Sequence, residues 1–155
     1  MTEKALELLS AKRFLDLKNL FAILNPADIA QILEELPHEH LPLLFRILPK
    51  ELAADAFIEM DNDSQELLIK GFNDKELREV LDELFVDDTV DLIEEMPAGV
   101  VKRILRNTDP ETRRIINQIL NYPEDSAGSI MTTEYVRLQK EMTVEQAFAR
   151  IKQTG

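Results

Sequence analysis

Acidic residues gather near the middle of the chain, and their spacing is the feature best suited to chemistry. From Asp74 to Glu95 there are ten acidic and two basic residues, a net charge of −8, whereas residues 96–155 carry seven acidic and nine basic residues. Asp87 and Asp91 are four residues apart, so on one helix they would project from the same side and repel each other. A divalent cation between them would relieve that repulsion. Carboxylate oxygens without Cys or His suit magnesium or calcium rather than zinc.

A purely structural interpretation of the same residues stays open. If the helix begins near Asp87 or Asp88, either side chain could cap it, and Asp91 would complement the positive end of the helix dipole. Under the metal interpretation, two aspartates on an exposed helix supply half a site, because magnesium keeps several waters and takes one or two carboxylates from any one surface. Another domain would then complete the site.

The composition excludes several classes of function. With 30 Asp and Glu against 18 Lys and Arg the net charge is −12, so we expect a cation rather than a nucleic acid as partner. The chain has no Cys, which excludes disulfides and thiolate metal sites. We find no Gly-rich phosphate loop or other catalytic motif, and we do not expect an enzyme. No apolar run approaches the ~18–20 residues of a membrane span, so we expect a soluble chain.

The elements that must position the acids are predicted to be short helices. Four Gly, no Trp and long stretches of Leu, Glu, Ala and Lys favour helix over strand. Apolar residues follow the i, i+3, i+4, i+7 pattern in segments 29–36, 41–48 and 77–84. Residues that stop or cap helices recur about every twelve positions, namely Pro37, Pro49, Asp61, Asp74, Asp87, Pro97, Asp109 and Asn121. Asn25-Pro26 and Asp109-Pro110 have the form of helix starts.

A sequence repeat supports a stacked arrangement of these helices. Residues 28–37 read DIAQILEELP and residues 88–97 read DTVDLIEEMP, so the first Asp, the Glu pair and the Pro match at a separation of sixty residues. Helices this short are marginal alone and must bury their apolar stripes against neighbours. We therefore predict a mainly α fold, a superhelical stack of short helices (an α-solenoid) over about residues 15–122.

The pattern changes after Tyr122. Residues 123–133 have lost the apolar stripe and are predicted to be a linker, and residues 134–138, EYVRL, are predicted to be a short strand. Thr143 and Gln146 form a predicted capping box that begins a helix running almost to the end of the chain. One strand and one helix cannot close a core, so residues 134–155 would be an incomplete module.

The junction resembles a known family. Residues 122–136 read YPEDSAGSIMTTEYV, which is similar to the stretch that joins the helical N domain of MgtE-type magnesium transporters to their first CBS domain. That family pattern is Tyr, a few acids, Ala-Gly-Gly or close to it, Met-Thr and then Tyr-Val. The Pro-punctuated helices upstream also look like that N domain, so the resemblance covers nearly the whole chain.

The resemblance implies a sensor with a magnesium cofactor. It divides the chain into a magnesium-sensing N domain (1–122), a linker (123–133) and the beginning of a CBS domain (134–155). The family's acid pair falls on Asp87 and Asp91, and its backbone carbonyl ligand falls on Ser129, where the family often has Gly. The implied partners are magnesium ions, the CBS and membrane domains of the same protein and a second copy in a homodimer, all at the cytoplasmic face of the membrane.

A scaffold is the competing prediction. The flagellar motor protein FliG has similar helical repeats, and a FliG-like α-solenoid could dock a partner helix without any role for metal. This alternative predicts an apolar groove lined by residues such as Phe45, Phe57 and Phe72, and no response to magnesium.

Overall fold

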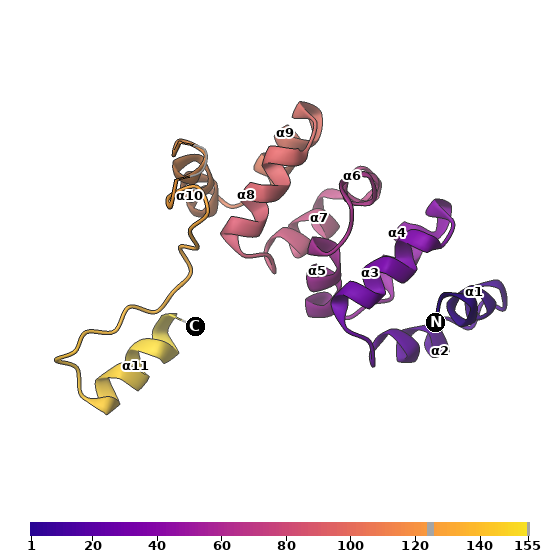
Figure 1. Ribbon diagram of the computed structural model, residues 1–155, viewed down its shortest axis with the longest axis horizontal. Helices are drawn as coiled ribbons and strands as arrows, with labels where there is room; N and C mark the ends of the chain where they lie inside the picture. Colours follow the sequence, from indigo (N-terminus) through magenta and orange to yellow (C-terminus); the bar gives the residue numbers. More distant parts are fainter. Residues whose placement is uncertain (124–125, 155) are drawn as a thin grey trace.

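The computed structural model describes residues 1–123 and 126–154 and shows a chain of short helices (Figure 1). The prediction of a mainly α fold is confirmed. Residues 124, 125 and 155, which belong to the predicted linker and CBS piece, lie outside the described residues. The helices are α1 (Thr2–Ser10), α2 (Phe14–Phe21), α3 (Pro26–Glu35), the 3₁₀ helix η1 (His38–His40), α4 (Leu41–Arg46), α5 (Lys50–Ile58), α6 (Asn62–Gly71), α7 (Asp74–Leu81), α8 (Val86–Glu95), α9 (Ala98–Asn107), α10 (Pro110–Ile119) and α11 (Val144–Thr154).

Helices α1–α10 form a stack in which each helix packs against near neighbours in the sequence. One row runs α3, α5, α7 and α9, each packed on the next, and α8 packs against α10 (Figure 1). The stack begins earlier than the predicted residue 15, because α1 packs on α2 and α3 and buries Ala5, Leu8 and Leu9. A continuous core of buried Leu, Ile, Val, Ala, Phe and Met side chains runs from Ala5 to Ile119.

The three phenylalanines that were predicted to line a groove are instead part of this core. Phe45, Phe57 and Phe72 are 4%, 1% and 4% exposed. The Phe45 ring meets the Phe57 ring edge-on at a centroid distance of 6.2 Å and the Phe72 ring at 5.3 Å. Phe45 and Phe72 border one pocket and Phe57 borders a different one. The aromatic side chains therefore hold α4, α5 and α6 together, because burying a large ring stabilises the fold more than exposing it.

The predicted capping residues are mostly correct. Asn25, Asp61 and Asp109 accept hydrogen bonds from backbone amides in the first turns of α3, α6 and α10. At α7 the cap is Asn73 rather than Asp74, because Asn73 and Glu76 complete a capping box. At α8 the cap position is Phe85, whose side chain supplies no hydrogen bond, so the interpretation of Asp87 or Asp88 as the cap is wrong.

The part of the chain after the stack differs from the prediction in one respect. The helix start at Thr143 is confirmed, since its amide donates to Gln146 Oε1 (2.9 Å) and its hydroxyl accepts from the Gln146 amide (3.3 Å). The strand predicted at 134–138 is wrong, as no strand occurs among the described residues. A strand needs a second strand to pair its backbone groups, and these residues have none.

Helix α11 stands clear of the stack at the end of an extended segment (Figure 1). It leaves Val144 (72%) and Phe148 (60%) exposed. Within the described ranges, no helix combines the length and the apolar character that crossing a bilayer requires.

Candidate metal site

The predicted site residues Asp87 and Asp91 lie on α8, a helix held by one buried face. Val86, Val90 and Ile93 are 5%, 1% and 7% exposed and share that face at helical spacing. Because Asp87 and Asp91 each follow a buried valine by one residue, they lie at the edge of the buried stripe. The helix thus fixes their positions, since its apolar side is pinned into the core.

The structure brings the carboxylates of α8 close enough to repel one another. Burial raises the pKa of the Asp88 carboxyl, and the negative charges of Asp87 and Asp91 raise it further. Partial desolvation also raises the pKa of Asp91, to which the charges of Asp87 and Glu95 add. The predicted interaction between Asp87 and Asp91 is therefore present in the fold.

These raised pKa values carry a cost at neutral pH. A carboxyl group whose pKa is higher in the folded chain holds its proton more tightly there than in the unfolded chain. Its contribution to stability therefore falls as pH rises from the ordinary carboxyl range through the folded pKa. Asp88 and Asp91 both have this sign. A bound cation would offset the cost by restoring a favourable partner for the charged form.

One atom of this acidic group lacks a partner. Asp87 Oδ1 is buried, and among the described residues it has no hydrogen-bond partner. An unpaired buried carboxylate oxygen is costly, and a cation is one kind of group that satisfies it. The donor set is carboxylate oxygen alone, which suits a hard divalent ion. The residues therefore fit a magnesium ligand set in chemistry.

These carboxylates are too few to form a complete metal site. Within the part of the chain that the structure describes, no group of three or more His, Cys, Asp or Glu side chains is arranged to hold a metal ion. Asp91 also faces a pocket of about 220 Å³ between α8 and the end of α5 and start of α6. Asp88 and Glu95 line the same pocket, opposite Asn62 and Gln65.

Ser129, the third predicted ligand, lies in a turn after α10 and is not joined to the aspartates by a polar contact. Its amide donates to the Ser126 carbonyl (3.1 Å), and its hydroxyl donates to the same carbonyl (2.9 Å). A Cβ at Gly128 would lie 2.5 Å from the Tyr122 ring, so only glycine allows Tyr122 to pack on this turn. The Tyr and Gly of the junction motif thus fix the turn that carries Ser129.

Glu134 belongs to the site region and was not found from the sequence. Its Oε2 accepts a hydrogen bond from the Val86 amide at the start of α8 (2.8 Å), across 48 positions of sequence. Its charge also contributes to the raised pKa of Asp88. The only local signal was indirect: Phe85 cannot cap a helix with its side chain, so α8 needed an acceptor from elsewhere.

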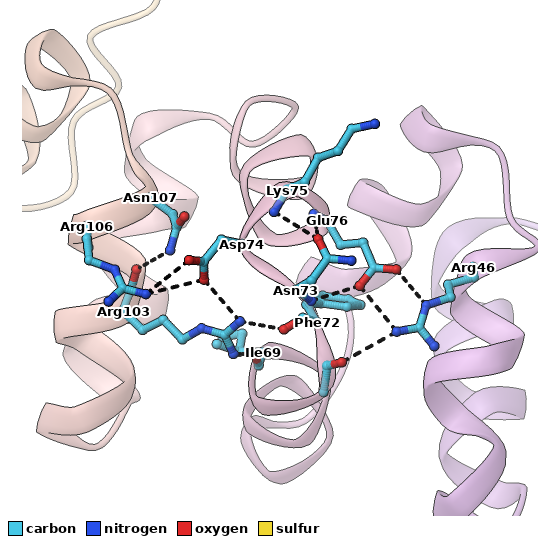
Figure 2. Close-up of polar contacts among 11 residues, drawn as sticks. Arg46, Ile69, Phe72, Asn73, Asp74, Lys75, Glu76, Arg103, Arg106 and Asn107 are labelled. Atoms are coloured by element: carbon cyan, nitrogen blue, oxygen red, sulfur yellow. Dashed lines mark hydrogen bonds and ion pairs between the residues drawn. The ribbon is translucent and has the colours of Figure 1, made fainter.

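Two arginines hold the turn between α6 and α7 (Figure 2). Arg103 of α9 donates to the carbonyls of Ile69 and Phe72. Arg46 of α4 donates to Glu76 at 2.7 and 3.2 Å and to the Gly71 carbonyl at 3.4 Å. The turn is therefore tied to α4 on one side and to α9 on the other.

Comparison with known proteins identifies relatives of this helical stack. Magnesium transporter MgtE of Bacillus subtilis is 26% identical over 137 residues, which are 88% of this chain and 30% of the relative. Magnesium transporter MgtE of Thermus thermophilus is 32% identical over 143 residues, 90% of this chain and 32% of the relative. The chain spans about a third of the length of these curated relatives.

Solved structures agree with this relationship. The crystal structure of the cytosolic domain of the Mg²⁺ channel MgtE in complex with ATP superposes with a TM-score of 0.85 at 29% identity, over 99% of this chain and 63% of that one. The crystal structure of the soluble part of a magnesium transporter gives a TM-score of 0.81 at 24% identity, over 99% of this chain and 60% of that one, and supports the fold. The family profile of the MgtE intracellular N domain matches residues 24–125. Since that match covers more than half of the sequence, the chain belongs to the MgtE intracellular N domain family.

Proposed function

We propose that this chain is the magnesium-sensing regulatory part of a magnesium transporter and lies at the cytoplasmic face of the membrane. The family and the two curated relatives, both named magnesium transporters, support this assignment. The observation that carries it is the crowding of carboxylates on α8, where Asp87 Oδ1 is buried without a partner among the described residues and the pKa of Asp91 is raised. Crowded acids of this kind suit a ligand that supplies positive charge.

In the proposed mechanism, Asp87 and Asp91 hold a cation at the surface of α8 and the backbone carbonyl of Ser129 contributes from the neighbouring turn. A divalent cation held there would supply two positive charges, and these would let a second acidic surface approach. We assign that surface to a CBS domain of the same protein. Residues 134–155 would be the first part of this CBS domain. The exposed apolar residues of α11 support this assignment, because a helix with a bare apolar face normally packs on further layers.

The gating force in this proposal is electrostatic. When magnesium is scarce, the carboxylates of the two surfaces face each other without a counter-charge. At an effective dielectric constant near 20, like unit charges about 4 Å apart repel by roughly 4 kcal/mol, and salt screens part of this. Several such pairs would separate the N domain from the CBS domain. The state of the membrane domain would then follow the difference in cation affinity between the joined and separated arrangements, in a homodimer of the complete protein.

The test is magnesium-dependent compaction of the parent transporter. The double variant Asp87→Asn and Asp91→Asn removes two charges with little change of shape, and it should abolish most of the decrease in radius of gyration that magnesium causes in X-ray scattering. The matched control is Glu3→Gln with Glu7→Gln, which removes an exposed acid pair of the same spacing from α1. Compaction that is unchanged in the double variant, or equally lost in the control, would remove α8 from the mechanism.

A second measurement separates this function from a metal-independent scaffold. Because Asp87, Asp91 and Ser129 are proposed as half a site, the 155-residue chain alone should bind magnesium weakly in calorimetry. Tight stoichiometric binding would contradict the shared site. A complete absence of any magnesium response in the parent protein would favour the FliG-like scaffold.

A further inference from the structure

The segment of residues 126–134, here termed the strap, is fastened to the stack although it follows the last helix of that stack. At one end of it, the Tyr122 ring packs against Gly128. In the middle, Met131 is partly buried against the core. At the other end, Glu134 accepts the hydrogen bond from the Val86 amide. After the strap the chain extends away from the stack to α11 (Figure 1).

The internal repeat shows that α8 lacks a side-chain cap that its counterpart α3 has. Helices α3 and α8 are both ten residues long and start two residues before the matching Asp28 and Asp88. At the cap position of α3, Asn25 accepts a hydrogen bond from the Asp28 amide at 2.8 Å. At the same position of α8 stands Phe85, which supplies no side-chain cap. Glu134 of the strap supplies the first turn of α8 with an acceptor at a different amide, that of Val86, whose counterpart in α3 is Pro26 and has no N–H.

The strength of the Glu134 contact depends on two opposed charge effects. The free amides at a helix N-terminus carry a partial positive charge, which attracts the Glu134 carboxylate. The Asp88 carboxylate in the same turn repels it, as the contribution of the Glu134 charge to the pKa of Asp88 shows. Neither effect is screened as in bulk water, because the hydrogen bond is partly buried.

We propose that Glu134 is a latch that joins the strap to the first turn of α8, and that its closure is set by the negative charge on that turn. Less negative charge on α8 tightens the latch and more negative charge loosens it. The strap precedes α11, so the latch connects the first turn of α8 to the segment that leads to the following module. The extension to magnesium as the agent that lowers this charge rests on the proposed function.

Amide hydrogen exchange of the full chain, in the absence of divalent ions, tests the latch directly. Removing a helix cap costs about 1 kcal/mol, so Glu134→Ala should raise the exchange rates of Val86 and of the strap about five-fold while α3 keeps its protection. Asp88→Asn should lower the same rates. The control is Glu141→Ala, which removes an exposed acid just past the strap, where Glu141 pairs with Lys140 at 3.7 Å. It should leave Val86 unchanged.

The outcomes separate the latch from the proposed function. Unchanged strap exchange in Glu134→Ala, or an equal rise in every helix, would overturn the latch even if the parent protein still compacts with magnesium. Magnesium chloride added to the unmodified chain should slow strap exchange, and Glu134→Ala should abolish this slowing. If the two variants shift exchange as expected without magnesium but magnesium has no effect, the latch stands and magnesium is not its agent.

Discussion

The guanidinium groups of Arg103 and Arg106 lie one helical turn apart on α9 but have different surroundings. Arg103 is 24% exposed at its side chain, donates to two backbone carbonyls of the α6–α7 turn and lies 3.5 Å from the Asp74 carboxylate. Arg106 is 67% exposed and pairs with the Asp74 carboxylate at 3.2 Å. A charged donor to partly buried carbonyls contributes far more than an exposed ion pair, which is worth little after screening.

Two alanine variants should therefore differ in stability. We expect Arg103→Ala to lower the free energy of unfolding by about 1.5–3 kcal/mol, because it leaves partly buried carbonyls without a donor. Arg106→Ala should lower it by less than about 0.5 kcal/mol. Urea unfolding, monitored by circular dichroism, measures the loss in both variants. Equal losses would show that the hydrogen bonds to the carbonyls add no stability beyond that of an exposed ion pair.

For single residues, the sequence predicts interactions between side chains that are close together in the chain. The spacing of Asp87 and Asp91 is enough to place both carboxylates on one side of a helix, and their mutual repulsion is present in the fold. The unpaired Asp87 oxygen and the Glu134 contact depend on which helices pack together. A partner 48 residues away has no signature in the residues around Val86. The role of Ser129 stays a prediction.

At the scale of single helices, the N-terminal cap of α10 can be tested for its contribution to stability. Its cap residue is Asp109. Its carboxylate accepts hydrogen bonds from the amides of Glu111 (2.9 Å) and Thr112 (3.1 Å), and the Thr112 hydrogen bonds lower its pKa. A lowered pKa means that the stabilisation is present above the ordinary carboxyl range and is lost as pH falls through the folded pKa.

Substitution at Asp109 should separate the hydrogen bonds from the charge. We expect Asp109→Ala to cost about 1 kcal/mol at pH 7, since no acceptor remains at the cap. Asp109→Asn keeps an acceptor and should cost less, and its stability should no longer contain the pH dependence of this carboxyl. Unfolding in urea from pH 7 down to pH 3 gives both numbers. A cost for Asp109→Asn as large as for Asp109→Ala would assign the effect to charge alone.

Helix boundaries were predictable because they depend on residues adjacent in sequence. Asn25 and Asp109, each followed by Pro, mark helix starts that the structure confirms. The strand at 134–138 failed for the opposite reason, since a strand is defined by a partner that this segment lacks among the described residues. Within the predicted linker, Met131 packs against the core, a contact that sequence cannot show because the core forms only when helices distant in sequence come together.

On the scale of the whole molecule, stability should vary along the stack. Each helix packs on near neighbours, so α1 has contacts on one side only, whereas α5 and α7 have helices on both sides. In such quasi-one-dimensional folds, local opening starts at the ends and costs most in the middle. Hydrogen exchange should therefore show the slowest amides in α5–α7, faster ones in α1 and the fastest in α11. Uniform protection across α1–α10 would indicate a single cooperative unit instead.

The two arginines on either side of the α6–α7 turn have a mechanical consequence. Arg46 and Arg103 bind opposite sides of that turn, so rotating one half of the stack against the other would break charge-assisted hydrogen bonds at the pivot. Helix α4 would then move together with the α6–α7 turn and α9 as one rigid arm. A small rotation at the α6–α7 turn would then displace α1, at the far end of the stack, by a larger distance than it displaces helices near the turn.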